Sequence, residues 1–161
     1  GALAGTGGFA RLAVSVSNAG GRPIPVKLEQ FDLQPAEALV WGFDAGWMEP
    51  EYDPMTERRW LWAGGRSVLA IHNAGRDVTI RVRGESPLRY FDGAPHVTVK
   101  AGERTIGTFS PDRDFVEEFT VPADALAASN GRVVVETDRT FRPPNGDTRL
   151  LGLRMYEVTV R

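Results

Sequence analysis

A regular series of short β-favouring segments between residues 67 and 137 constrains the fold of this chain more than any other feature. Each segment is rich in valine, isoleucine, threonine or phenylalanine, and turn-forming residues such as Asn73-Ala74-Gly75 and Asn130-Gly131 separate one segment from the next. The segments are Ser67–His72, Val78–Arg83, Val97–Ala101, Thr105–Phe109, Phe115–Val121 and Val133–Thr137. Short strands at spacings of roughly 8 to 15 residues are typical of an antiparallel β-sandwich or barrel.

Further strand signals lie on both sides of this series. They are Arg11–Ser17, Pro25–Phe31, Leu39–Phe43, Arg58–Trp62 and Leu150–Val160, and Asn18-Ala19-Gly20-Gly21 closes the first of them as a turn. We expect the last of these strands to lie inside a sheet with both edges paired, and its Gly152 indicates a bulge or a close approach of another segment. Helical signal is confined to Pro122–Ala128 and a brief turn over Pro35–Ala38. The sequence therefore predicts an all-β, antiparallel sandwich with at most one or two short helical turns.

The length of 161 residues suits a single domain with a sizeable core. We place this domain at residues 11–161, after a flexible Gly- and Ala-rich segment or linker over residues 1–10. The opening residues lack the charged region of a signal peptide, and we interpret them as a linker or expression scar of a domain taken from a larger protein. The net charge of −2 argues against nucleic acid as a partner, and no apolar run is long enough for direct membrane insertion. The absence of cysteine excludes disulfides and thiolate metal sites.

The stretch from Phe43 to Trp62 holds three of the four tryptophans and a concentration of charged side chains. Its middle, from Gly46 to Thr56, contains two prolines and no periodic apolar face. This pattern predicts a long irregular loop that leads into the strand Arg58–Trp62. Because binding residues are concentrated on loops that a rigid scaffold positions, this loop is the first place to look for a ligand site.

The aromatic residues of this stretch have two interpretations. Trp60 and Trp62 share one face of a strand, because side chains alternate along it. They either pack into the sandwich core, with each indole N–H satisfied, or form a flat platform on which a sugar ring stacks. Trp47 lies outside any strand pattern and is the better candidate for such a platform.

Three acidic residues in the same stretch are spaced by two. In an extended segment, the side chains of Glu49, Glu51 and Asp53 project the same way. They could accept hydrogen bonds from sugar hydroxyls or bind calcium, which takes several carboxylate oxygens. The alternative without a binding role is that they form solvent-exposed ion pairs with Arg58 and Arg59, which contribute little to stability.

A carboxylate and a guanidinium lie two residues apart before the last strand. Asp147 and Arg149 could together form a bidentate fork for vicinal hydroxyls, or an ion pair that fixes the final loop to a sheet. Since the ends of a sandwich chain often return beside its first strands, we expect Arg149 to meet Glu49, Glu51 or Asp53, or to share a ligand with them.

Signatures of catalysis are weak in this sequence. His72 and His96 are isolated, and neither a Gly-x-Ser-x-Gly nor a His-Glu-x-x-His motif occurs. A glycoside hydrolase could use two carboxylates from residues 49–53 and Asp147, but it needs one of them with a raised pKa. The nearby arginines would lower the pKa of those carboxylates. We therefore expect a protein that is not an enzyme.

The order of several short motifs resembles a known family. The motifs are Gly46-Trp47-x-Glu49-Pro50-Glu51, Arg59-Trp60-x-Trp62, Gly84-Glu85-Ser86-Pro87, Val121-Pro122-Ala123, Phe141-x-Pro143 and Asp147-x-Arg149-x-Leu151-Gly152-Leu153. From about Leu39 to Val160 the chain is similar to jelly-roll β-sandwich modules with a galactose-binding-like fold. Such modules accompany bacterial membrane glycosyltransferases and other surface-polysaccharide proteins. The chain departs from the pattern at Trp60-Leu61-Trp62, where an arginine between the two aromatic residues is expected.

The resemblance implies a non-catalytic, carbohydrate-binding-like accessory module of a larger bacterial cell-envelope protein, periplasmic or extracellular. We expect no cofactor, with calcium as the one candidate metal. The module's partner would be a glycan or the parent membrane protein. The ligand-binding candidates are Trp47, Glu49, Glu51, Arg59, Asp147 and Arg149, and the calcium candidates are Glu49, Glu51 and Asp53. The alternatives are a structural or protein-interaction domain that packs on its parent or on a second copy, and a glycoside hydrolase.

Overall fold

A computed structural model describes residues 16–24, 38–72, 74–144 and 146–161 of the chain. The chain divides into two compact units, residues 1–38 and 39–161. In the first unit, Asn18 closes the predicted turn: its carbonyl accepts the N–H of Gly21, and its side chain accepts the N–H groups of Gly20 and Arg22. The strands predicted over residues 11–17 and 25–31 and the helical turn over 35–38 lie wholly or mostly outside the described residues, and the domain start at residue 11 stays a prediction.

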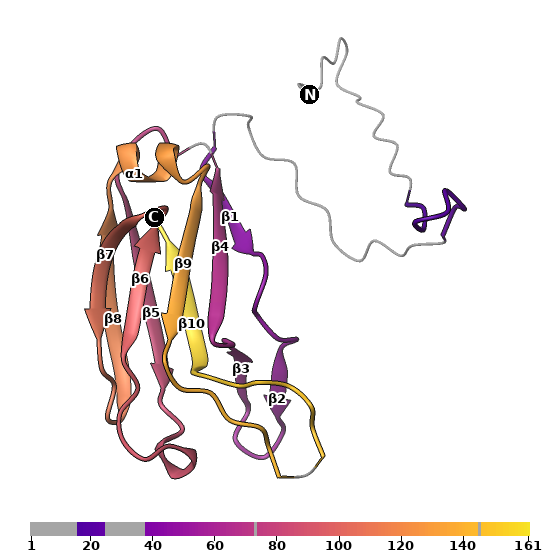
Figure 1. Cartoon of the computed structure of the whole chain (residues 1–161), viewed down its shortest axis with the longest axis vertical. Helices are drawn as coiled ribbons and strands as arrows, with labels where there is room; N and C mark the ends of the chain where they lie inside the picture. Colours follow the sequence, from indigo (N-terminus) through magenta and orange to yellow (C-terminus); the bar gives the residue numbers. More distant parts are fainter. Residues whose placement is uncertain (1–15, 25–37, 73, 145) are drawn as a thin grey trace. The chain divides into compact units, whose positions relative to one another are not determined.

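The second unit contains two antiparallel five-stranded sheets, counted over the described residues (Figure 1). The first, called the β4 sheet, has the order β1 (Val40–Phe43), β4 (Arg66–His72), β9 (Arg132–Thr137), β6 (Val97–Ala101), β7 (Arg104–Phe109). The second, called the β10 sheet, has the order β2 (Glu51–Asp53), β3 (Arg58–Trp62), β10 (Arg154–Val160), β5 (Val78–Glu85), β8 (Asp114–Val121). A 3₁₀ turn, η1 (Leu88–Tyr90), and a short helix, α1 (Ala123–Ala128), complete the elements and confirm the predicted near-absence of helix.

The strand pairing is that of a jelly roll. From β3 onward the strands pair first with last: β3 with β10, β4 with β9, β5 with β8, and β6 with β7. Contacts of β10 with β5 and of β9 with β6 then join these pairs into the two sheets. This is an antiparallel ribbon folded over on itself, with β1 and β2 added as edge strands. The predicted antiparallel sandwich is therefore confirmed.

The core lies between the sheets and follows from the alternation that the sequence shows. Along β5, Val78, Ile80 and Val82 are buried, whereas the intervening residues turn outward. They pack with matching positions of the opposite sheet, such as Val99 and Val133. The face of the β10 sheet turned away from this core, here called the outer face, carries the charged residues of β5 and β8.

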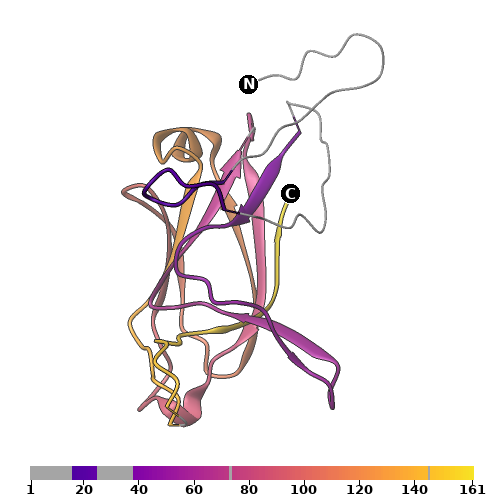
Figure 2. The ribbon, with the colours of Figure 1, turned by 90° about the vertical axis from the view of Figure 1, so that its right-hand side faces the viewer.

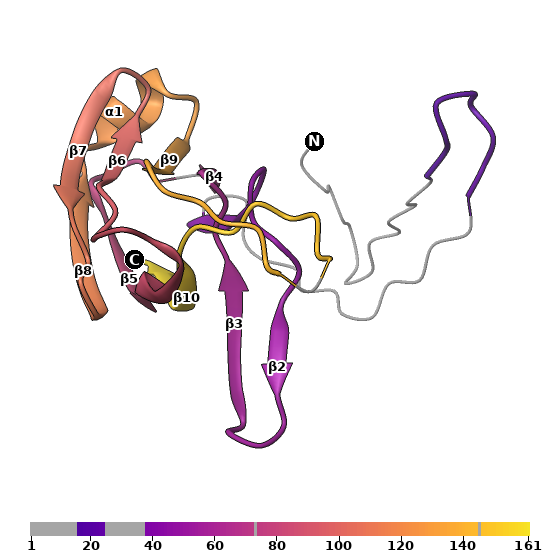
Figure 3. The same ribbon diagram turned by 60° about the horizontal axis from the view of Figure 1, so that its bottom comes forward.

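The prediction of an irregular loop from Gly46 to Thr56 is wrong, because β2 lies within this range. β2 and β3 form a hairpin that projects from the sandwich (Figures 2 and 3). Asp53 closes the turn by accepting the N–H of Met55 and the hydroxyl of Thr56. Glu57 completes the turn with φ = 54°, a left-handed conformation. The two prolines flank β2 instead of interrupting it, so they leave the ladder intact.

The last strand is paired on both edges, as predicted, although it begins at Arg154 and not at residue 150. Gly152 makes the expected close approach: its N–H donates to the carbonyl of Ala63, and an added Cβ would lie 2.8 Å from Cγ2 of Thr137. The bulge in this region is at Tyr156, where the register with β5 shifts. In the part of the chain that the structure describes, no helix has the length and apolar character needed to cross a membrane.

Candidate functional site

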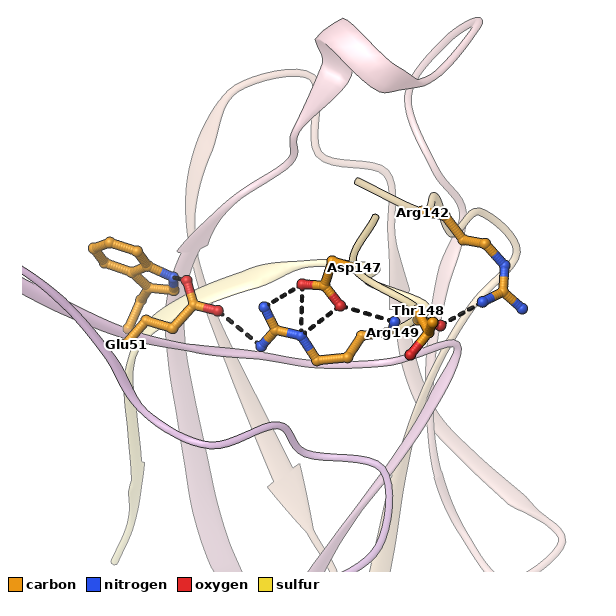
Figure 4. A network of polar contacts seen from close by, with 6 residues as sticks. Glu51, Arg142, Asp147, Thr148 and Arg149 are labelled. Carbon is orange, nitrogen blue, oxygen red and sulfur yellow. Dashed lines mark hydrogen bonds and ion pairs between the residues drawn. The ribbon is translucent and has the colours of Figure 1, made fainter. Parts of the chain in front are cut away.

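Arg149 connects the final loop to the β2–β3 hairpin (Figure 4). Its Nε lies 2.8 Å from Oδ2 of Asp147 and its Nη1 lies 2.8 Å from Oε1 of Glu51. The backbone N–H of Arg149 also donates to Asp147, and Arg142 donates to the carbonyl of Thr148, which closes the loop. The prediction that Arg149 meets an acidic residue of the hairpin is thus confirmed at Glu51. We call Glu51, Asp147 and Arg149 the Arg149 network.

The contacts within this network favour the charged forms of Asp147 and Arg149. Hydrogen bonds from the side chain and then the backbone of Arg149 hold the pKa of Asp147 below its ordinary value. A hydrogen bond to Asp147, followed by the close contact with Glu51, raises the pKa of Arg149. The contact with Oε1 of Glu51 is an ion pair without hydrogen-bond alignment, while Oε2 of Glu51 accepts the indole N–H of Trp60 at 3.0 Å. The guanidinium is therefore engaged by two carboxylates before any ligand arrives.

Trp60 and Trp62 lie on the outer face of the β10 sheet. Trp62 is buried, as the core interpretation predicts, but outside the cluster between the sheets, and Trp60 is half-buried. Trp62 is paired with Arg154, whereas the next residue, Met155, points into the core. The guanidinium of Arg154 lies 4.9 Å from the ring centroid of Trp60 and 4.7 Å from that of Trp62, and it donates to Glu85 at 2.8 Å. An arginine thus lies against both indoles, but β10 supplies it and not the strand that carries them.

The loop between β9 and β10 covers Trp62. The ring of Phe141 packs edge-on against Trp62 with centroids 5.7 Å apart, and it stacks on Tyr90 at 4.0 Å. Phe91 contacts the same phenylalanine edge-on. Trp62 retains 4% of its exposure as a result. This small aromatic cluster is a second apolar centre, and it explains why a tryptophan on the outer face is buried.

Trp47 is also less accessible than a sugar platform requires. Its indole N–H donates to the carbonyl of Val68 at 2.8 Å, and its ring lies 4.8 Å from that of Phe43. It is half-buried and packs against the core. Glu49 is exposed in the irregular segment just before β2. The ligand-binding roles of these residues stay predictions, but the Trp47 ring already has structural partners.

A calcium site is not assembled by the predicted residues. Both oxygens of Asp53 take part in the hairpin turn, and these hydrogen bonds, first from the Thr56 side chain and then from the Met55 backbone, lower its pKa. Glu51 faces Trp60 and Arg149. Among the described residues, no group of three or more His, Cys, Asp or Glu side chains could hold a metal ion.

A separate pocket of about 570 Å³ opens where β3 diverges from β10. β3 pairs with β10 only at Leu61 and Trp62. Its first residues are therefore not hydrogen-bonded to β10, and they line one side of the pocket. The lining residues come from β3, β5, β8 and the bulge of β10 (and one from the hairpin turn): Glu57, Arg58, Arg59, Arg83, Gly84, Asp114, Phe115, Val116 and Tyr156. We call this the Arg58–Arg59 pocket.

Two of its cations lack a close ion pair among the described residues, although Asp53 lies across the hairpin from Arg58 and its pKa is lowered in part by that charge. Within residues 38–72, 74–144 and 146–161, neither Arg58 nor Arg59 forms an ion pair, and both are exposed. The guanidinium of Arg59 lies 5.5 Å from the ring centroid of Tyr52. In contrast, Arg83 lies 3.4 Å from a carboxylate oxygen of Glu157.

The sequence pointed to Arg59 but not to the rest of this pocket. Arg83, Asp114 and Tyr156 come from three other strands, and their assembly depends on the sheet order β3-β10-β5-β8. The hydroxyl of Tyr156 donates to Glu85, and burial followed by this bond raises its pKa. The available signal was the run of polar residues at outward positions of β5 and β8, which indicates a face but not a pocket.

Comparison with known proteins identifies no relative of this chain. No known family matches the chain, and neither a curated protein nor a solved structure shows significant similarity to it. The resemblance to galactose-binding-like modules therefore rests on the order of its short motifs alone, and function has to be argued from the site.

Proposed function

We propose that this chain is a non-catalytic carbohydrate-binding module of the galactose-binding-like type, part of a larger bacterial cell-envelope protein, and that it works in the periplasm or outside the cell. The observation that carries the proposal is the Arg58–Arg59 pocket on the outer face of the β10 sheet. Its volume lies in the range of small-ligand sites, roughly 300 to 1,000 Å³. This proposal puts the binding site in the Arg58–Arg59 pocket and not in the loop that the sequence suggested.

The chemistry of the lining suits a polyhydroxylated ligand. Arg58 and Arg59 provide planar sets of donors, and the carboxylates of Glu57 and Asp114 provide acceptors. The ring of Tyr156 and the exposed Val116 add apolar surface against which the C–H face of a sugar can pack. A mixture of donors, acceptors and an aromatic ring within one open pocket is what sugar hydroxyls and ring faces require.

Hydrolysis of a glycan has less support than binding. A glycoside hydrolase needs a carboxylate pair in which one member has a raised pKa and acts as the acid. The pKa of Asp147, a predicted candidate, is lowered instead. Its partner in the Arg149 network, Glu51, is already engaged by Arg149 and Trp60.

The test is to fill the pocket without touching the core. Val116 is 52% exposed on β8 and lines the pocket, so Val116→Trp should place an indole in it. Thr120 lies on the same face of the same strand, four positions further along and outside the lining, and Thr120→Trp is the matched control. Binding to a panel of neutral and acidic oligosaccharides would be measured by calorimetry.

We expect Val116→Trp to weaken binding by about 10-fold to 100-fold, a change that corresponds to the loss of one or two good contacts. Thr120→Trp should bind like the parent chain. If both variants bind equally well, or if the parent chain binds no member of the panel, the proposal is wrong.

The β2–β3 hairpin favours a second candidate function, a protein-interaction domain. Tyr52 is 53% exposed and Met55 at the turn is 90% exposed, which places apolar side chains on a projecting element (Figure 3). Such a hairpin could dock on the parent protein or on a second copy of the chain. Light scattering of the parent chain and of Met55→Asp, over a range of concentrations, tests self-association. A monomer at all concentrations in both cases would exclude the second copy as the partner.

A further inference from the structure

We propose that the Arg58–Arg59 pocket selects acidic saccharides, in which a carboxylate or a sulfate ester on the sugar is bound at the arginine-lined β3 side of the pocket. This inference rests on the proposed carbohydrate-binding function and names the class of ligand. A resemblance to sugar-binding modules does not specify charge, and the charge preference is argued here only from the side chains of the pocket.

The first step is the charge of the lining. Three arginines and two acidic residues, Glu57 and Asp114, surround the pocket. Arg83 is partly neutralised by Glu157, 3.4 Å away on the neighbouring strand. Neither Arg58 nor Arg59 forms an ion pair in the described part of the chain. Asp53 offsets part of the Arg58 charge from across the hairpin, and the two arginines together leave a positive potential at the β3 side of the pocket.

The second step is a comparison with other arginines of the same sheet. Arg81 contacts Glu118 and Glu157, and Arg154 contacts Glu85. These guanidinium groups use their donors inside the protein. Arg58 and Arg59 belong to the same sheet and carry the same chemical group, but both are exposed, and the contact of Arg59 is with the ring of Tyr52. Their position, and not merely their presence, makes them available to a ligand.

The third step is the chemistry of the ligand. A guanidinium donates two parallel N–H groups, and these match the two oxygens of a carboxylate or of a sulfate ester. The remaining space is open and lined by Tyr156 and Val116, so the rest of a sugar ring can be accommodated beside the anionic group. A neutral sugar can accept hydrogen bonds from the same groups but gains no charge interaction.

The experiment compares ligands that differ in charge alone. Trigalacturonate and its methyl ester form one pair, and a sulfated galactan oligosaccharide and its desulfated form make the other. Binding of each would be measured by calorimetry, at low and at high salt, to the parent chain and to the double variant Arg58→Gln/Arg59→Gln. The control is Arg76→Gln/Arg104→Gln, which removes the same number of charges from exposed positions outside the pocket.

We expect the parent chain to bind at least one acidic ligand about 10-fold to 100-fold more tightly than its neutral counterpart, with weaker binding at high salt. The pocket variant should lose this preference, and the control variant should keep it. The pair that responds identifies the anionic group as a carboxylate or a sulfate.

Three results would overturn the inference, and they differ in what they say of the proposed function. If acidic and neutral ligands bind equally well and Val116→Trp abolishes both, the pocket binds sugars without selecting charge, and the proposed function stands. If neither acidic nor neutral ligands bind, both the inference and the proposed function fail. A charge preference that survives Arg58→Gln/Arg59→Gln would place the anionic group elsewhere and would also overturn the inference.

Discussion

The β2–β3 hairpin takes part in two polar regions that differ in one respect. In the Arg149 network, β2 supplies Glu51, and the guanidinium of Arg149 is engaged by two carboxylates. In the Arg58–Arg59 pocket, β3 supplies two guanidinium groups that form no ion pair among the described residues. Both regions have the composition of a binding site, but only the second has donors that are still free for a ligand.

This difference shows how to separate structural charge from functional charge. Removing one member of a half-buried ion pair destabilises the fold, because it leaves the other charge without its partner, and a ligand would have to displace these partners before it could bind. An exposed, unpaired group contributes little to stability and can bind without such a cost. The following predictions test the comparison by asking which region changes stability and which changes binding.

The largest effect is expected at the aromatic centre next to the Arg149 network. Trp62 is buried under Phe141 and contacts Arg154, so Trp62→Ala should lower the free energy of unfolding by about 3 to 5 kcal/mol. Chemical denaturation measures this. Met55→Ala, at the exposed tip of the hairpin, is the control and should leave stability unchanged. A small effect at Trp62 would mean that the loop between β9 and β10 does not cover it in solution.

A smaller loss of stability is expected for Trp47. The half-buried ring packs on Phe43, and its N–H donates to Val68, so Trp47→Ala should cost about 2 kcal/mol. Trp47→Phe keeps most of the packing and should cost about 1 kcal/mol, for the lost hydrogen bond. Thermal melting of both variants measures these losses. An unchanged melting temperature together with lost sugar binding would restore Trp47 as a ligand platform.

The Arg149 network should show measurable coupling. Arg149→Gln and Glu51→Gln each remove one side of the ion pair, and each should cost on the order of 1 kcal/mol. In a double-mutant cycle the two losses should be smaller together than their sum, because the same contact is removed twice. Glu49→Gln, an exposed residue of the same stretch, is the control. Strict additivity would show that the contact contributes nothing in solution.

The same network should make stability depend on pH in the acid range. The pKa of Asp147 lies below its ordinary value of 3.8 in the folded chain, so its ionised form stabilises the fold. This contribution is complete above the pKa of the unfolded chain and is lost as the pH falls from there through the folded pKa. In Asp147→Asn, melting temperatures between neutral pH and acid should fall less steeply than in the parent chain. Parallel curves would contradict the lowered pKa.

Much of the fold could be predicted from the sequence, because it depends on local patterns. The alternation of apolar residues in Val78–Glu85 and the turns at Asn130-Gly131 are each visible within a few residues. The sandwich class was predicted in this way, whereas the order of strands in the two sheets comes from the structure. β2 was missed because it is three residues long and lies between prolines, which suggested a loop.

The candidate site was harder to predict, because its members are brought together by pairing between distant strands. The meeting of Arg149 with Glu51 could be anticipated from the return of the last strand. The contact of Arg154 with both indoles could not, since it depends on the register between β3 and β10. For the same reason no local motif joins Arg59 to Tyr156, although both line one pocket.

The smallest effect on stability is expected in the pocket, and it decides the comparison. Arg58 is exposed and forms no ion pair in the described part of the chain, so Arg58→Gln should change the free energy of unfolding by no more than about 0.5 kcal/mol. Removing the charge of Arg58 also removes a minor cause of the lowered pKa of Asp53, and this should change the free energy of unfolding only slightly. If urea denaturation gives a loss as large as that of Arg149→Gln, Arg58 is a structural residue like Arg149. The Arg149 network and the Arg58–Arg59 pocket would then both stabilise the fold, and the absence of an ion pair would not distinguish a ligand-binding arginine from a structural one.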